Sequence, residues 1–169
     1  ATVSITAISA DSGVSSSDFI TNDKTLSYSG EVSNFTANGD LIELVLKDST
    51  GAVVGGTFVM PASNGTWTWD NTSVTRADGN YTLTATVVDK AGNRVNTAAG
   101  GTDNQVVTID STSPGQNENG QSAAQTKPIV SIPEATSGLS AAELTDGVQT
   151  EVTLPSGTKA GDKITLTVT

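Results

Sequence analysis

The chain contains no cysteine and no histidine, and only 2 Trp, 2 Tyr and 3 Phe occur among its 169 residues. Without cysteine there can be no disulfide, so rigidity must come from other interactions. Without either residue type, neither a Ser-His-Asp nor a Cys-His catalytic arrangement can be built, and a His-containing zinc site is excluded. A pair of carboxylates could still hydrolyse a glycoside, but no pair here lies in a sequence context that suggests a cleft. We therefore expect a protein that is not an enzyme.

Positive charge is also scarce, because 18 acidic residues face 8 basic ones and the formal net charge is −10. This balance argues against binding to nucleic acid or to anionic membrane surfaces, and it is consistent with binding of many cations. No apolar run is long enough to span a bilayer and no signal peptide is recognisable, so we expect no direct membrane insertion.

What the chain has in abundance is Thr, Ser, Val and Gly, in short segments where apolar and polar residues alternate. This period of two predicts β-strands, with Gly-, Asn- and Asp-rich turns between them. The predicted strands are 3–8, 26–32, 41–47, 53–60, 66–69, 81–87 and 105–110. About seven short strands in about 110 residues are typical of an all-β fold, the immunoglobulin-like Greek-key β-sandwich.

Part of this pattern occurs twice at a fixed spacing. Leu26 and Val148 begin similar strands, Asp40 and Asp162 precede similar strands, and each pair is 122 positions apart. A fixed period indicates a tandem repeat. We predict a complete sandwich over 1–110, a polar linker over 111–127, and the first three strands of a second, incomplete copy over 128–169. Truncation of a longer array and completion by another chain are both open explanations of the half-domain.

Acidic and amide side chains cluster in the loop of residues 11–23, between the first and second strands. Calcium takes six to eight oxygen ligands, and a Gly- and Ser-rich loop with spaced Asp can supply them. The first strand places this loop at the carboxyl end of the sandwich, where the last strand ends and the sixth begins, so acidic groups from three segments should converge there. The candidate calcium ligands are Asp11, Asp18, Asn22, Asp23, Asp78, Asp110 and, in the second copy, Glu134.

The same residue types also build ordinary turns, because Asp, Asn and Ser side chains hydrogen-bond to nearby backbone N–H groups. This alternative applies to the acidic loop as a whole. It applies more strongly to Asp40 and to the turn of Asp89 and Asn93 at the opposite end of the sandwich, and Asp162 matches Asp40 in the second copy.

Three segments carry a resemblance to a known family: Ile20–Asp23 at the end of the acidic loop, Gly79–Asn93, and Val107–Asp110 with Pro114. They resemble the bacterial immunoglobulin-like repeats of giant Gram-negative surface adhesins, of the biofilm-associated and repeats-in-toxin families, and 132–162 is similar to another repeat subtype. The resemblance implies a secreted, cell-surface protein in which calcium stiffens the domain junctions. It assigns the acidic positions of the family to Asp11, Asp18, Asp23 and Asp110. The linker of residues 111–127 departs from the family, whose repeats join through fewer residues.

These observations favour a structural extender of a calcium-stiffened adhesin. Its partners would be the neighbouring repeats of the same chain, and other domains would reach host or surface ligands. One alternative is a module that binds sugar, peptide or ice, and another is an accessory sandwich of a secreted hydrolase. Sugar binding would need an exposed aromatic ring. We expect one of Trp67 and Trp69 to face the core and the other to face solvent.

Overall fold

The computed structural model describes residues 1–95, 99–117, 121–123, 126–133, 138, 140–141, 145 and 147–167. They divide into two compact units, Ala1–Ser111 and Thr112–Thr169. None of the described residues belongs to a helix with the length and apolar character that a membrane-spanning helix requires.

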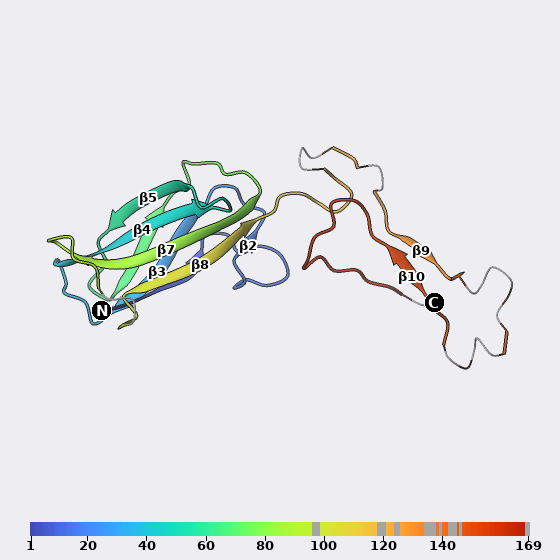
Figure 1. The fold of residues 1–169 in the computed structure, drawn as a ribbon, viewed down its shortest axis with the longest axis horizontal. Helices are drawn as coiled ribbons and strands as arrows, with labels where there is room; N and C mark the ends of the chain where they lie inside the picture. The colour runs from blue at the N-terminus through green and yellow to red at the C-terminus, as the bar shows by residue number, and fades with distance from the viewer. Residues whose placement is uncertain are drawn as a thin grey trace. The chain divides into compact units, whose positions relative to one another are not determined.

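The first unit is a sandwich of two sheets, one antiparallel and one mixed, whose strands come from along its whole length (Figure 1). One sheet has the order β1-β3-β6 and the other has the order β2-β8-β7-β4-β5, with β2 and β8 parallel. The predicted all-β, immunoglobulin-like fold is therefore confirmed. The strands are β1 (Thr2–Ile8), β2 (Ile20–Thr21), β3 (Ser27–Ser33), β4 (Asp40–Asp48), β5 (Val53–Val59), β6 (Thr66–Asp70), β7 (Gly79–Asp89) and β8 (Thr102–Ile109).

The connections have the immunoglobulin arrangement. The chain crosses from one sheet to the other between β3 and β4, and it crosses again before and after β6. β5 pairs with β4 and so adds a strand to the sheet that contains β7 and β8. The unit resembles the variable type of the fold in this respect, because that type also adds strands to this sheet. Near the start of β7, the Tyr81 hydroxyl donates to the Ala77 carbonyl oxygen at 2.9 Å, which is the tyrosine corner of the same fold.

The core forms because one face of each strand is apolar. On β4, Ile42, Leu44 and Leu46 are fully buried, and the register places Leu44 beside Ala85 and Leu46 beside Leu83 of β7. The core cluster consists of Val3, Ile5, Ile8, Phe19, Leu26, Tyr28, Val32, Ile42, Leu44, Leu46, Trp67, Trp69, Tyr81, Leu83, Ala85, Val87, Val107 and Ile109. The interior between the sheets thus replaces the disulfide that the chain lacks.

Both tryptophans lie in this core. Trp67 is 2% exposed and Trp69 is 8% exposed, so the prediction that one of them faces solvent is wrong. The reason is the pleat of the strand, which puts residues two apart on the same face. Gly30, opposite Trp67 in the register, makes room for the indole, and Trp69 packs against Tyr28 with ring centroids 5.3 Å apart.

A cation is buried beside these rings. Arg76 is 8% exposed, its guanidinium carbon lies 5.7 Å from the centroid of the Tyr81 ring, and its Nη1 donates to the Val54 carbonyl oxygen at 3.3 Å. Its Nε and Nη2 are buried with no hydrogen-bond partner. Burial raises the pKa of Tyr28, and the positive charge of Arg76 opposes that rise. Arg76 therefore links β5 to the aromatic part of the core.

The second unit contains β9 (Ile129–Ser131) and β10 (Glu151–Thr153), which pair antiparallel with Val130 opposite Val152. The pairing has the same sense as that of β1 with β3 in the first unit. Two of the three strands predicted for the second copy are present among the described residues, and residues 163–167, where the third is predicted, carry no strand. Apolar side chains on these segments, including Ile164 and Leu166, are exposed.

Substitution of Gly30 by Ala tests the packing between Trp67 and β3. A Cβ at this position would overlap both the Ser4 carbonyl oxygen and the Trp67 ring, and a backbone atom cannot move aside cheaply. We expect Gly30→Ala to lower the free energy of unfolding by about 3 kcal/mol, the upper part of the range for overpacking. Chemical denaturation measures this loss.

The control is Ser29→Ala on the neighbouring position of the same strand, which is only partly buried. It should change the free energy of unfolding by no more than about 0.5 kcal/mol. Equal effects of the two substitutions would contradict the packing assigned to Gly30.

Candidate metal site at the acidic end of the sandwich

The sheet register brings three of the predicted ligands to one end of the first unit. Ile109 pairs with Thr21 on one side and with Gly79 on the other, and the Asp110 N–H donates to the Thr21 carbonyl oxygen at 2.8 Å. Asn22 follows Thr21, Asp78 precedes Gly79 and Asp110 follows Ile109, so the three residues lie at neighbouring positions at this end of the sheet. The two-residue strand β2, which the sequence pattern did not reveal, fixes the acidic loop at this end.

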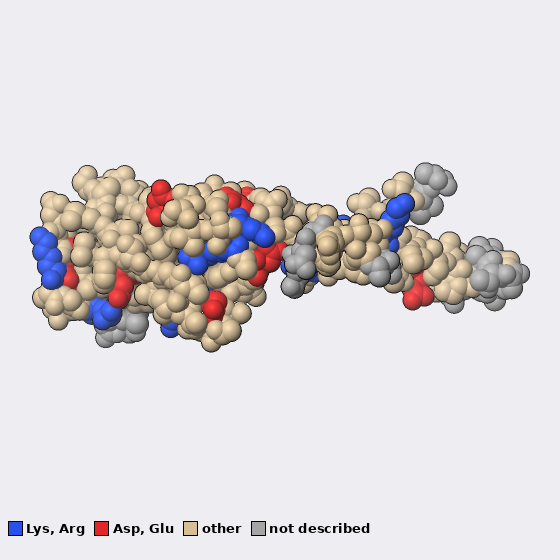
Figure 2. Space-filling model, turned by 90° about the horizontal axis from the view of Figure 1, so that it is seen from above, with Lys and Arg blue, Asp and Glu red and all other residues tan. Residues whose placement is uncertain are grey.

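Asp78 binds Ser111, the residue at which the chain leaves the sandwich. Its carboxylate accepts hydrogen bonds from the Ser111 N–H at 2.9 Å and from the Ser111 hydroxyl at 2.8 Å. The Lys24 Nζ lies 3.1 Å from its Oδ1. Figure 2 shows that acidic and basic side chains adjoin one another on a surface that is mostly uncharged. Part of the negative charge expected here is therefore neutralised by a lysine.

Asp23 is engaged in a local turn. Its Oδ1 accepts from both the N–H and the hydroxyl of Thr25, each at 2.8 Å. Asp48 and Asp70 make the same two bonds to a Thr two residues later, and so does Asn64, whose side chain is neutral. Because an amide serves equally well, this role of Asp23 requires no charge and no metal.

Asp18 and Asn22 also hydrogen-bond within the loop. Asp18 Oδ1 accepts from the Ile20 N–H at 3.1 Å, and Asn22 Oδ1 accepts from the Ser12 hydroxyl at 3.0 Å. The same Ser12 hydroxyl accepts from the Asn22 N–H at 2.9 Å. These bonds order the loop and direct side-chain oxygens toward the chain itself.

Asp11 differs from the other acidic residues of the loop. Its Oδ2 accepts from the Phe19 N–H at 3.0 Å, across eight residues of chain, while its Oδ1 is buried and has no hydrogen-bond partner. Phe19 adopts a left-handed backbone with φ of 61°, which is uncommon for an aromatic residue. An unpaired buried carboxylate oxygen is costly unless a cation or a proton satisfies it. Asp11 is therefore the residue whose geometry best fits a metal ligand.

The structure does not gather the candidates into one ready-made cluster. Within the described part of the chain, no three His, Cys, Asp or Glu side chains lie close enough together to hold a metal ion. Glu134 lies outside the described residues. The assignment of the seven residues to calcium stays a prediction.

The carboxylates at the opposite end of the sandwich build turns. Asp40 Oδ2 accepts from the Thr36 N–H at 2.8 Å, and Asp162 Oδ2 accepts from the Lys159 N–H at 2.8 Å in the second unit. Asp89 Oδ1 accepts from the N–H groups of Ala91 and Asn93. The Asn93 side-chain amide also donates to Asp89 Oδ2, at 2.9 Å. The turn interpretation of Asp40 and Asp89 thus has direct geometric support.

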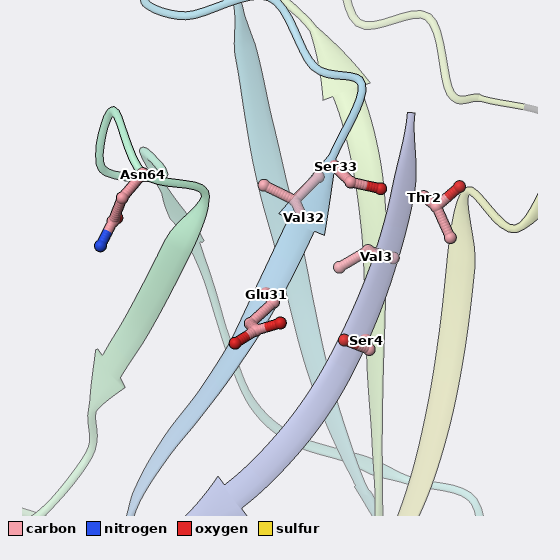
Figure 3. A pocket seen from close by; sticks show the side chains of 7 residues that line it. All are labelled: Thr2, Val3, Ser4, Glu31, Val32, Ser33 and Asn64. Atoms are coloured by element: carbon pink, nitrogen blue, oxygen red, sulfur yellow. The ribbon is translucent and has the colours of Figure 1, made fainter.

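A small hollow lies between β1 and β3 at this end of the three-stranded sheet (Figure 3). Polar side chains from β1, β3 and the turn before β6 surround it, and none of its lining residues is aromatic. The lining residues are Thr2, Val3, Ser4, Glu31, Val32, Ser33 and Asn64. It lacks the ring on which a sugar stacks.

Comparison with known proteins gives one family and one solved structure. The sequence profile of the family described as "Bacterial Ig-like domain" matches residues 1–111. A crystal structure of a tetra-tandem repeat in the extending region of a large adhesion protein is similar, at 21% sequence identity and a TM-score of 0.40. The alignment covers 90% of this chain and 38% of that chain, so this chain spans well under half of its length. Among curated proteins there is no match.

Removal of the Asp78 side chain should loosen the end of β8. Asp78→Ala takes away the acceptor of two hydrogen bonds from Ser111, and bonds to a charged group contribute about 1.5–3 kcal/mol. We expect the free energy of unfolding, measured by chemical denaturation, to fall by about that amount. Lys24→Met removes only the half-exposed ion pair and should cost less than about 1 kcal/mol. Because Asp78→Ala removes the ion pair as well, equal losses for the two variants would show that the ion pair, not the hydrogen bonds, holds this end.

The carboxyl group of Asp89 should titrate with a lowered pKa. The Asn93 side-chain amide and then the backbone N–H groups of the turn hold the pKa of Asp89 below its ordinary value. A lowered pKa in the folded state stabilises the turn above about pH 4 and ceases to do so as the pH falls through the folded pKa. We expect Asn93→Ala to raise the pKa of Asp89, as measured by NMR titration of the carboxyl carbon.

Asp70 serves as the internal control for this titration. The Thr72 hydroxyl is the main cause of its lowered pKa, and Asn93 plays no part there. The pKa of Asp70 should therefore be the same in the wild-type chain and in Asn93→Ala. A parallel change in both carboxyls would mean that the substitution acts on the whole fold.

Proposed function

The chain belongs to the bacterial Ig-like domain family, and from this premise we propose that it is a structural extender segment of a secreted, cell-surface adhesin. Its task would be to hold a distal binding module away from the cell. The first unit forms the rigid element, and the neighbouring Ig-like units of the same chain are its partners.

The observation that carries this proposal is where the chain enters and leaves the first unit. The starts of β1 and β8 lie together, because the Val3 N–H donates to the Gly100 carbonyl oxygen and the Ile5 N–H donates to Asp103. The end of β8 lies beside β2 at the acidic end. The chain therefore enters at one end and leaves at the other (Figure 1). This arrangement suits domains strung head to tail, in which force passes along the length of each sandwich.

Calcium is part of the proposal because the acidic end offers one residue that fits it. The buried, unpaired Oδ1 of Asp11 would gain a partner, and loop oxygens of Asp18 and Asn22 could complete the ligand set. The ion would supply positive charge and cross-link the loop to itself. The residues of the chain keep the loop in place, since the Phe19 carbonyl oxygen accepts from the Thr108 N–H of β8 at 2.9 Å.

The alternative functions have less support. A sugar-binding role that depends on an exposed tryptophan is contradicted by the burial of Trp67 and Trp69. In the part of the chain that the structure describes, peptide or ice binding has no residue arrangement in its favour beyond Thr and Ser on the strand faces, which sheet propensity explains. An accessory role beside a hydrolase would leave catalysis to another domain, so it also describes a chain that is not itself an enzyme.

A thermal melt tests the calcium part. Binding to the folded state alone raises stability, by about 2.7 kcal/mol when calcium is at one hundred times its Kd. For a unit of this size that corresponds to a rise in Tm of roughly 10 °C. We expect the rise in calcium relative to chelator, and we expect Asp11→Asn to abolish it while preserving the acceptor for Phe19.

The matched control is Asp70→Asn, because Asn64 already makes the same turn as Asp70 in this chain. This variant should show the full calcium-dependent rise. The same Tm in calcium and in chelator for the wild-type chain would refute calcium binding. An undiminished rise in Asp11→Asn would refute the assignment of the site.

A further inference from the structure

The edges of the sandwich are protected to different degrees. The outer edge of β1 is closed, because its Val3 N–H donates to the Gly100 carbonyl oxygen at 3.0 Å and its Ile5 N–H donates to Asp103 Oδ2 at 2.8 Å. An edge strand whose N–H groups are already bonded offers little to an incoming strand. This edge is therefore not available for pairing.

The edge formed by β2 and β8 is closed as well. β2 has only two residues, the Thr108 N–H donates to the Phe19 carbonyl oxygen, and the Val106 carbonyl oxygen accepts from the Gln105 side-chain amide at 3.0 Å. β6, at the other border of the three-stranded sheet, has five residues, and its Thr66 carbonyl oxygen accepts from the Ala62 N–H at 2.8 Å. Short strands and bonded backbone groups are common ways to protect an edge.

The remaining edge, β5, is different. It has seven residues, VVGGTFV, with no proline and no charged side chain, and in the described structure it pairs only with β4 (Figure 1). Arg76 occupies the Val54 carbonyl oxygen, and no other bond to the outer edge of Gly55–Val59 is present among the described residues. Val53 is 64% exposed, Phe58 is 57% exposed and Met60 directly after the strand is 56% exposed. The register with β4 shifts between Val53 and Gly55, so a bulge interrupts the start of the strand, whereas residues 56–59 continue in regular register. A regular, apolar edge without such protection is the kind that pairs with another strand.

Charge does not oppose pairing at this edge. On the neighbouring strand β4, Glu43 is paired with Arg94, whose Nη2 and Nε donate to its two carboxylate oxygens at 2.7 and 2.9 Å. Lys47 of β4 lies opposite Val53. Asp48 follows Lys47 at the end of β4, so the charges of Glu43, Arg94, Lys47 and Asp48 beside β5 balance one another.

We propose that β5 is a self-association edge, at which β5 of a second copy of this chain adds antiparallel about a two-fold axis. An antiparallel pair of identical strands is self-complementary, so both copies satisfy their free backbone groups at once. The five-stranded sheet would continue from one copy into the other, and the two Phe58 side chains would cover apolar surface on its outer face. This goes beyond extension along the chain, because it joins extenders side by side.

Sedimentation velocity of the full chain across a wide concentration range tests the proposal. We expect a reversible dimer that becomes stronger at high salt, because salt screens the repulsion between two acidic chains. Phe58→Lys places a charge on the edge and should weaken the dimer at least about tenfold. Val106→Lys is the matched control, because Val106 is 52% exposed on the outer face of the same sheet, on β8.

Each outcome of this experiment either supports or overturns the proposal. A wild-type dimer that Phe58→Lys weakens and Val106→Lys preserves supports the proposal, provided that the melting curves show both variants folded. A chain that is monomeric at every concentration and salt overturns it. A dimer that survives Phe58→Lys also overturns it, since association would then occur through another surface such as the exposed apolar residues of the second unit. Equal weakening by both variants overturns the assignment to β5.

Discussion

The whole first unit depends on the apolar interior between two sheets that no covalent bond holds together. The alternating residues of β4 and β7 fill its centre, and the Trp67 indole fits only because Gly30 has no side chain. Most of the few aromatic side chains, Phe19, Tyr28, Trp67, Trp69 and Tyr81, lie in this core between the sheets. The turns and the acidic loop are then placed by strands that the core has already fixed.

Much of this fold is predictable because a period of two leaves a clear signal. All seven strands predicted from alternation are present as β1 and β3–β8, within a few residues at their ends. β2 escaped prediction because two residues are too few to show a period and because Phe19, just before it, adopts a left-handed backbone. The side assigned to one tryptophan was wrong, since residues two apart share a face. Burial of Arg76 could not be foreseen, because it depends on a contact with Val54 of β5, 22 residues away in the sequence.

The roles of the individual acidic residues are not determined by the sequence alone. An Asp or Asn followed two residues later by Thr builds the same turn at positions 23, 48, 64 and 70, where one side-chain oxygen accepts both donors of the Thr. The same spacing also occurs at positions 34, 80 and 110, and at position 80 the Asn Oδ1 accepts from the Thr108 hydroxyl instead, so the spacing alone does not predict this turn. The folded chain gives Asp23 the role of a turn residue, and its assignment to calcium stays a prediction. Asp11 has no such partner nearby, and its distinguishing feature, a buried oxygen without a donor, exists only in the folded loop. Composition could therefore suggest cation binding as a hypothesis, without indicating which carboxylate has a buried, unpaired oxygen.

The most direct test of the extender account is single-molecule force spectroscopy on the chain held at its two ends, in calcium and in chelator. The unit Ala1–Ser111 should unfold in one event that releases about 370–400 Å of extended chain, and at higher force in calcium. Gradual yielding without such an event would contradict a rigid, load-bearing unit. An unfolding force that is the same in both conditions would contradict stiffening by calcium.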